Sequence, residues 1–207
     1  MMVQYGFYYD NSRCTGCKTC VMACKDYHDT ALDVAYRKVY DLEGGTWAKD
    51  ANGTYSTDCL FYHLSMACNH CEDPACVAAC PTTAMHKEKD RGLVLVDDSK
   101  CVGCGYCVMA CPYNAPKVSR DLGHSVKCNG CQDRLDQGLQ TICVMACPLR
   151  ALDFGPIDEL RAKYGDNAQI HPMPEPSYTK PNITIKPSPA ALDPAAANTR
   201  VANPKEV

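Results

Sequence analysis

The feature that most constrains this chain is the grouping of its cysteines. Sixteen of the seventeen cysteines fall into four tight groups, and most gaps inside a group are two or three residues long. Neighbours this close cannot easily pair as disulfides, but they can share one metal centre. The odd total also disfavours a fully oxidised framework, so metal ligation is the better interpretation. The groups are Cys14, Cys17, Cys20 and Cys24; Cys68, Cys71, Cys76 and Cys80; Cys101, Cys104, Cys107 and Cys111; and Cys128, Cys131, Cys143 and Cys147.

The spacing inside the groups indicates which metal centre they hold. Groups one and three read C-x2-C-x2-C-x3-C. In two-cluster bacterial ferredoxins this run gives three thiolates to one cluster, and its fourth cysteine ligates the other cluster. Each ferredoxin-like unit therefore needs two groups, so four groups predict two units and four [4Fe–4S] clusters. Structural zinc is the alternative, but zinc sites usually show separated CxxC pairs, often with histidine.

The groups also repeat as two alternating motif types. C-V-M-A-C ends groups one, three and four, and C-V-A-A-C ends group two. Groups one and three each continue C-x-G-C, whereas groups two and four open with C-N-x-C and exit with C-P-x-x-A. Duplication of a two-motif unit is the simplest explanation. The spacing leaves the pairing of groups open, because neighbouring and nested pairs both combine unlike motif types.

The segments between and after the groups predict an α+β fold with a small β insertion. Strand-like runs at residues 5–9 and 93–96 precede groups one and three. In the insertion, residues 36–40, a Gly44-Gly45 turn and residues 60–64 predict a hairpin or small sheet. Residues 156–164 predict a short helix, with acidic residues in its first turn, basic residues in its last turn and Gly165 at its exit.

The end of the chain is rich in proline. From His171 onward it carries eight of the fourteen prolines and an alanine-rich stretch at residues 190–197. A disordered tail is one interpretation. We favour an extended arm on a partner subunit for residues 171–187, with Tyr178, Ile183 and Ile185 as anchors. For the remainder we expect disorder in the absence of a partner.

Two reactive side chains lie outside the four groups or beside them. Cys59 is the leftover cysteine, and we interpret it as a free, partly buried thiol in the insertion. His86 lies six residues after Cys80, where a histidine can move a proton or sense redox change. A surface histidine with no such role is the simpler interpretation.

Charge and hydropathy exclude several classes of partner. The net charge is −3 with 22% charged residues, so no strongly basic surface is implied and nucleic acid is not an expected partner. No apolar run approaches the roughly 20 residues that span a bilayer. The first ten residues lack the pattern of a signal peptide. Export together with a partner that carries a signal stays open.

Several long strings carry a resemblance to a known family. They include R-C-T-G-C-K-T-C at residues 13–20, C-N-H-C-E-D-P-A-C at 68–76, P-L-R-A-L-D-F-G-P-I-D-E-L-R at 148–161 and the final N-P-K-E-V. Over nearly its whole length the chain resembles the four-cluster iron–sulfur subunits of molybdopterin oxidoreductases of the dimethyl sulfoxide reductase type. The resemblance implies nested units. Residues 1–29 and 112–155 would form an outer unit, 67–111 an inner unit, 30–66 an insertion, and 156–207 a helix with an extended tail.

The resemblance also implies which cysteines share a cluster. Cluster one takes Cys14, Cys17, Cys20 and Cys147, and cluster two takes Cys24, Cys128, Cys131 and Cys143. Cluster three takes Cys68, Cys71, Cys76 and Cys111, and cluster four takes Cys80, Cys101, Cys104 and Cys107. In the related nitrate reductase subunit one ligand of group three is tryptophan and that cluster loses an iron. Here Cys104 and Cys107 are both present, so all four clusters are expected to be [4Fe–4S].

The same resemblance implies a non-catalytic electron-transfer subunit. Cluster one would face a molybdopterin-containing catalytic subunit, and cluster four a membrane subunit that oxidises menaquinol. The chain would lie on the cytoplasmic membrane only through these partners, and electrons would run from cluster four to cluster one in a reductase. The alternatives are a free polyferredoxin-type carrier, which the insertion and tail disfavour, and the same subunit serving another substrate, such as an aromatic, catechol or sulfur compound.

Overall fold

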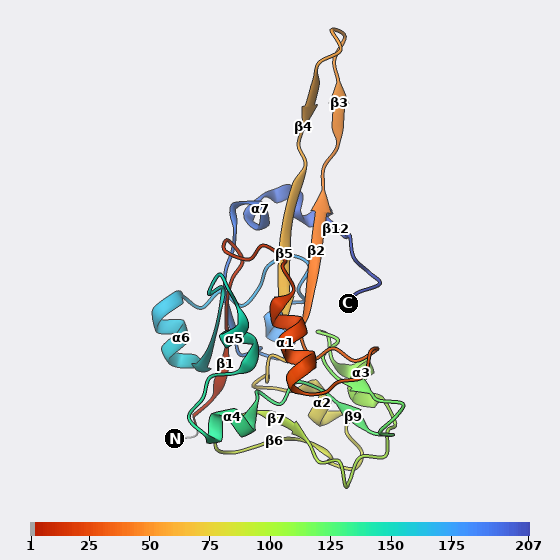
Figure 1. Cartoon of the computed structure of the whole chain (residues 1–207), viewed down its shortest axis with the longest axis vertical. Helices are drawn as coiled ribbons and strands as arrows, with labels where there is room; N and C mark the ends of the chain where they lie inside the picture. The colour runs from red at the N-terminus through yellow and green to blue at the C-terminus, as the bar shows by residue number, and fades with distance from the viewer. Residues whose placement is uncertain (1–2) are drawn as a thin grey trace.

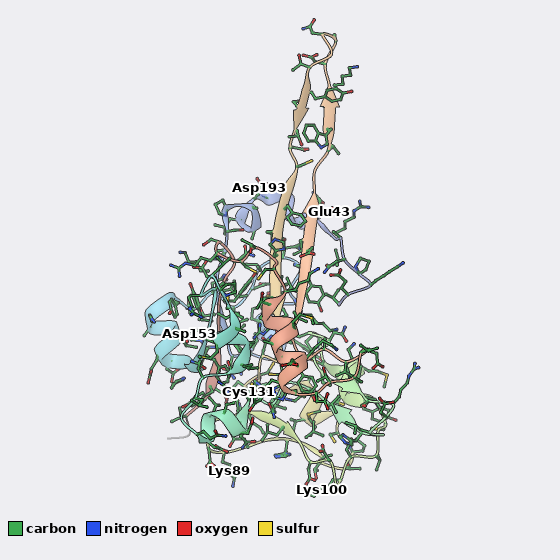
Figure 2. The ribbon with its side chains drawn as sticks, in the orientation of Figure 1. Glu43, Lys89, Lys100, Cys131, Asp153 and Asp193 are labelled. Carbon is green, nitrogen blue, oxygen red and sulfur yellow. The ribbon has the colours of Figure 1, made fainter. Side chains whose placement is uncertain are left out.

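The computed structural model describes residues 3–207 and combines short helices with small sheets (Figure 1). A long hairpin projects from one end of the body, and helices and loops that carry the cysteines fill the other end. Figure 2 shows Glu43 at the base of this hairpin, Lys89 and Lys100 at the opposite end, and Cys131 between them. No helix in these residues has the length and apolar character needed to cross a bilayer.

A three-stranded sheet of order β10–β1–β11 holds the main core. β1 (Tyr5–Asp10) pairs antiparallel with β10 (Leu152–Pro156) and parallel with β11 (Ile183–Lys186). Phe7 stands opposite Phe154, and their rings lie 4.5 Å apart between centroids. The strand predicted at residues 5–9 is therefore confirmed.

The other face of this sheet is covered by helix α6 (Ile157–Tyr164). Tyr8 of β1 stacks on Tyr164 at 3.6 Å, beside the buried side chains of Ile157 and Leu160. The helix ends at Gly165, whose φ of 92° suits a residue without a Cβ. This confirms the helix predicted from the placement of its charges and its closing glycine.

The insertion forms a long hairpin. β2 (Lys38–Gly44) pairs antiparallel with β5 (Leu60–Met66), and the hairpin continues outward through β3 (Trp47–Lys49) and β4 (Tyr55–Thr57). The predicted turn at Gly44-Gly45 is wrong, because the chain continues outward there from β2 to β3 and turns only at residues 50–54. Gly45 has φ +86°, and a Cβ on it would lie 2.5 Å from the Asp58 carbonyl oxygen. Gly45 thus permits a close approach of the two sides of the hairpin, and the chain does not reverse its direction there.

The cysteine groups are carried by short helices and the hairpins beside them. α1 (Thr19–Tyr27) packs on α5 (Ile142–Ala146), and α2 (Ala75–Ala78) packs on α3 (Tyr106–Ala110). β6 (Met85–Lys87) pairs with β7 (Val94–Val96), as the run at residues 93–96 predicts. β8 (Lys117–Val118) pairs with β9 (Ser125–Val126), and α4 (Gln132–Asp136) follows Cys131. Elements near groups one and four therefore pack together, as do elements near groups two and three.

The C-terminal segment packs on its own chain. It contains the 3-10 helices η1 (Pro176–Tyr178) and η2 (Pro194–Asn198), helix α7 (Pro189–Leu192) and strand β12 (Arg200–Val201), which pairs with β2. Asn203 then closes the contact, because Asp41 N–H donates to its Oδ1 at 2.8 Å and its Nδ2 donates to Val39 O at 2.9 Å.

Two expectations about this segment were wrong. Ile183 and Ile185 do not anchor an arm on a partner, because both are buried in the chain's own core, whereas Tyr178 is 63% exposed. The residues after Pro187 are not disordered, because they return to β2. The proline content was misleading, because the prolines lie outside the two segments that pair as strands, β11 and β12. These proline-free segments pair with the edges of β1 and β2.

We expect Ile185→Ala to lower the free energy of unfolding by about 2–5 kcal/mol, because its side chain is only 1% exposed and its loss leaves a cavity. The measurement is the urea midpoint for loss of cluster absorbance in the purified protein. Tyr178→Ala is the control and should change the free energy of unfolding by less than about 0.5 kcal/mol. Equal midpoints for wild type and Ile185→Ala would contradict the packing of β11.

Candidate iron–sulfur sites

The four cysteines predicted for cluster one line a single cavity. Two come from the loop after β1, one from the first turn of α1 and one from the end of α5. The loop turns at Gly16, whose φ is +66°, and a Cβ there would lie 2.3 Å from the His63 ring. The cysteines of this cluster-one cavity are Cys14, Cys17, Cys20 and Cys147.

The four cysteines predicted for cluster four line a second cavity of the same kind. Three come from the loop and first turn of α3, and one follows α2. Gly103 takes the place of Gly16, again with φ +66°, and a Cβ on it would lie 2.5 Å from the Gly123 carbonyl oxygen. The cysteines of this cluster-four cavity are Cys80, Cys101, Cys104 and Cys107.

Equivalent polar groups reach the sulfurs in both cavities. In each, a backbone N–H donates to the cysteine that the other group contributes, and a serine hydroxyl lies beside the third cysteine of the ligand loop. Such contacts stabilise negative charge on sulfur and help to set a cluster's reduction potential. The pairs are Ala151 N with Cys147 Sγ (3.3 Å), Met85 N with Cys80 Sγ (3.3 Å), Ser65 Oγ with Cys20 Sγ (3.6 Å), and Ser125 Oγ with Cys107 Sγ (3.3 Å).

The four cysteines predicted for cluster two lie together in the interior, and all four are buried. Cys24 stands on α1 one turn beyond Cys20, which is about 6 Å of rise along the helix. Burial raises the pKa of the Cys24 thiol, and the nearby thiols of Cys128, Cys143 and Cys131 raise it further. Two cysteines one turn apart on α1 thus belong to different sets: Cys20 lines the cluster-one cavity, and Cys24 lies among the second set of thiols.

The four cysteines predicted for cluster three also lie close to one another. Burial raises the pKa of Cys76 to about 12, and the thiols of Cys68, Cys111 and Cys71 add to the shift, which Lys127 opposes. Thiols this hard to ionise alone become favourable ligands when bound cations replace their protons. Two of these cysteines are buried and two are half-buried.

The four sets form a series. Burial raises the pKa of Cys20 in the first set, and the nearby thiol of Cys143 in the second set adds to the shift. Burial likewise raises the pKa of Cys128 in the second set, and Cys68 of the third set adds to it. Cys76 of the third set shares one apolar cluster with Cys107 of the fourth. Among the predicted ligands, only Cys17 and Cys104 are exposed, and they belong to the first and last sets.

The arrangement fits four-iron clusters. Within residues 3–207, no three or more His, Cys, Asp or Glu side chains converge on one metal-ion position. Ligands of a cubane bind separate iron atoms and therefore stand farther apart than ligands of a single ion. Two cavities with four thiols on their walls, and N–H groups aimed at those sulfurs, have the donors that a cluster needs.

Sequence reasoning missed the polar groups beside the sulfurs. Ser65 and Ser125 each lie three residues before the first cysteine of a C-N-x-C motif, so aligning groups two and four would have found both. His28 was also missed, and its Nε2 lies 3.4 Å from Cys131 Sγ. Burial lowers the pKa of His28, which favours the neutral imidazole beside that thiol.

Cys59 and His86 are the two reactive side chains outside the ligand sets. The prediction that Cys59 is partly buried is wrong. Cys59 is exposed at the base of the outer hairpin, with its Sγ 3.7 Å from the Thr46 carbonyl oxygen. His86 is half-buried on β6, with Nδ1 3.1 Å from the Ala84 carbonyl oxygen, and its role stays a prediction.

Comparison with known proteins agrees with this chemistry. Residues 59–157 match the 4Fe-4S dicluster domain family, and residues 5–26 match the 4Fe-4S binding domain family. Over 207 residues the protein is 54% identical to a subunit of anaerobic dimethyl sulfoxide reductase from Escherichia coli K12, covering 100% of both sequences. It is 51% identical to the corresponding subunit from Haemophilus influenzae, again over 100% of both.

The chain belongs to the dimethyl sulfoxide reductase iron–sulfur subunit family. A more distant relative is the thiosulfate reductase electron transfer subunit of Salmonella typhi, 38% identical over 157 residues, or 75% of this chain and 78% of that one. As a member of this family the chain is an electron-transfer subunit of an oxidoreductase complex and carries [4Fe–4S] clusters. The predicted cofactor and electron-transfer role are thereby confirmed, and sixteen grouped cysteines suffice for four clusters.

Proposed function

We propose that this chain connects a membrane subunit that oxidises menaquinol to a molybdopterin catalytic subunit of a dimethyl sulfoxide reductase-like enzyme. Electrons enter at cluster four and leave at cluster one. The observation that carries the proposal is the series of four cysteine sets, with its exposed ligands Cys104 and Cys17 in the terminal sets. An electron-transfer chain needs terminal clusters near the surface and middle clusters shielded from water. The exposed ligands of the terminal sets and the mostly buried cysteines of the middle sets fit this need.

The proposal includes the nested pairing of groups and the ligand set of each cluster. Contacts between elements support nesting: β1 pairs with β10, and α1 packs on α5, which join groups one and four. The pairing of β6 with β7 and the packing of α2 on α3 join groups two and three in the same way. Ser125 lines the cluster-four cavity, so β9 serves the inner unit although it follows that unit in sequence.

When bound, [4Fe–4S] clusters supply one-electron carriers, and the protein supplies their position and surroundings. The chain holds each set of thiols on a loop and a short helix, which fixes the separation between sets. Its buried cysteines keep water from the middle of the series. Backbone N–H and serine O–H groups beside the sulfurs stabilise added negative charge.

The choice of partners rests on the relatives. Those that match over their whole length are subunits of anaerobic dimethyl sulfoxide reductase, whereas the thiosulfate reductase subunit matches less of the chain at lower identity. A sulfoxide reductase is therefore the favoured catalytic partner, and thiosulfate or another sulfur compound is the second candidate. The membrane partner follows from the family resemblance and from the need for an electron donor at cluster four.

The test is affinity purification of the tagged chain from membranes of anaerobically grown cells. We expect a large pterin-containing protein and a multi-span membrane protein to co-purify, with about sixteen iron atoms per chain. A menaquinol analogue should then reduce the clusters, and dimethyl sulfoxide should reoxidise them. A chain that purifies alone and exchanges electrons with soluble donors would support a free carrier instead.

A further inference from the structure

A buried arginine lies where the proposed clusters one and two approach each other. Arg37, just before β2, is only 2% exposed. One of its terminal nitrogens donates to Ser65 Oγ at 3.1 Å and to Ser65 O at 3.4 Å, and the guanidinium lies 4.6 Å above the Phe7 ring. Its Nε has no hydrogen-bond partner among residues 3–207. The guanidinium is therefore a buried cation with few polar contacts in the protein.

Arg37 has no carboxylate partner in the part of the chain that the structure describes. Removing a charge from water without a counter-ion is strongly unfavourable, so some negative charge must offset it in the working protein. Burial by itself lowers the pKa of Arg37, but the thiols of Cys143, Cys20, Cys128 and Cys24 outweigh burial and raise it.

The position of those four thiols identifies the source of the negative charge. Cys20 belongs to the proposed cluster one, and Cys24, Cys128 and Cys143 to the proposed cluster two. Ser65 also connects Arg37 to the cluster-one set, since its hydroxyl lies 3.1 Å from an Arg37 nitrogen and 3.6 Å from Cys20 Sγ. Arg37 thus reaches the cluster-one set through the Ser65 hydroxyl, and the thiols of the cluster-two set lie near enough to favour its charged form.

We propose that the fixed positive charge of Arg37 stabilises the reduced states of clusters one and two and so raises both reduction potentials. The inference rests on the ligand sets proposed above. Each transfer moves one electron, so one negative charge is gained beside Arg37 and one is lost from the preceding carrier, with no proton exchanged. Arginine suits this role because its guanidinium stays charged at any physiological pH. Its charge acts strongly because the low-dielectric interior screens it little.

The test is a potentiometric titration of the purified complex, followed by electron paramagnetic resonance. In Arg37→Gln and Arg37→Met, we expect the ratio of reduced to oxidised cluster at a fixed potential to fall about tenfold for clusters one and two, or about 59 mV for a one-electron couple. Arg37→Lys keeps the charge and should retain most of both potentials. Arg200→Gln is the control, because Arg200 is exposed and pairs with Glu43 at the surface.

Every outcome of this titration decides the proposal. Lowered potentials for clusters one and two, with clusters three and four unchanged, support it. So does loss of clusters one and two in both neutral variants when Arg37→Lys retains them, since charge is then what assembly requires. Unchanged potentials, an equal shift of all four clusters, or loss of clusters in all three variants would overturn it. Co-purification of partners is scored separately, so failure of the proposed function stays distinguishable.

Discussion

Cys147→Ser is expected to abolish cluster one and to leave the cluster held by Cys101, Cys104 and Cys107 intact. In the nested arrangement Cys147 completes the set of Cys14, Cys17 and Cys20, whose cavity it lines. Serine is a poor ligand for iron, which is held by thiolates in these clusters. The measurement is the electron paramagnetic resonance spectrum of the reduced complex, with iron counted per chain. One of the four signals should disappear or change to that of a three-iron cluster.

This variant separates nested from neighbouring pairing of the groups. If groups three and four formed one ferredoxin-like unit, Cys147 would complete the cluster of Cys101, Cys104 and Cys107 instead. Cys111→Ser is the matched variant, because Cys111 is the fourth cysteine of group three and lies among the thiols of group two. Nesting predicts that Cys111→Ser removes the cluster of Cys68, Cys71 and Cys76. Neighbouring pairing predicts instead that Cys147→Ser removes the cluster of Cys101, Cys104 and Cys107. It also predicts that Cys111→Ser removes the cluster of Cys128, Cys131 and Cys143. These two losses together would refute nesting.

Cys104→Ser is expected to disturb cluster four and to lower quinol-dependent turnover at least about tenfold. Cys104 is the exposed cysteine of the cluster-four cavity, so the iron that it binds faces the proposed electron donor. Disturbing this iron slows electron transfer from the donor to cluster four. Cluster one is not affected, because its thiols keep their contacts. Turnover is measured with a menaquinol analogue and dimethyl sulfoxide. An artificial donor that reduces the catalytic subunit directly should restore much of the rate.

Cys59→Ser provides the control for Cys104→Ser. It makes the same chemical change at an exposed cysteine that lies at the base of the outer hairpin, outside all four ligand sets. Its spectra and turnover should match those of the wild type. Unchanged cluster spectra and turnover in Cys104→Ser would refute the assignment of cluster four, and loss of a cluster in Cys59→Ser would show that a ligand had been overlooked.

In the proposed function, the two terminal sets are the ones that face the two partners. Their ligand loops are short and lie near the surface, so an electron has little protein to cross when it arrives or leaves. The middle sets are mostly buried, which removes water and makes nearby fixed charges effective over a longer range. Arg37 lies in that interior rather than at an accessible end.

The sequence by itself determined the chemistry of this protein. Cubane ligation demands thiolates at short, fixed intervals, so the intervals remain visible in the chain whatever surrounds them. The glycines of C-x-G-C and the strands before groups one and three are local requirements of the same loops, and they too were predictable. The helix at residues 157–164 was predictable because its capping and charge pattern are local.

Only the tertiary structure decided what lies against those loops. The return of β12 to β2 and the burial of Ile185 depend on free strand edges far away in sequence, which composition does not record. Ser65 reaches Cys20 across 45 residues, and Arg37 lies near thiols from two groups. Spacing along the chain specifies the ligands that one group supplies, whereas packing decides which distant cysteine joins them and which polar groups lie beside the sulfurs.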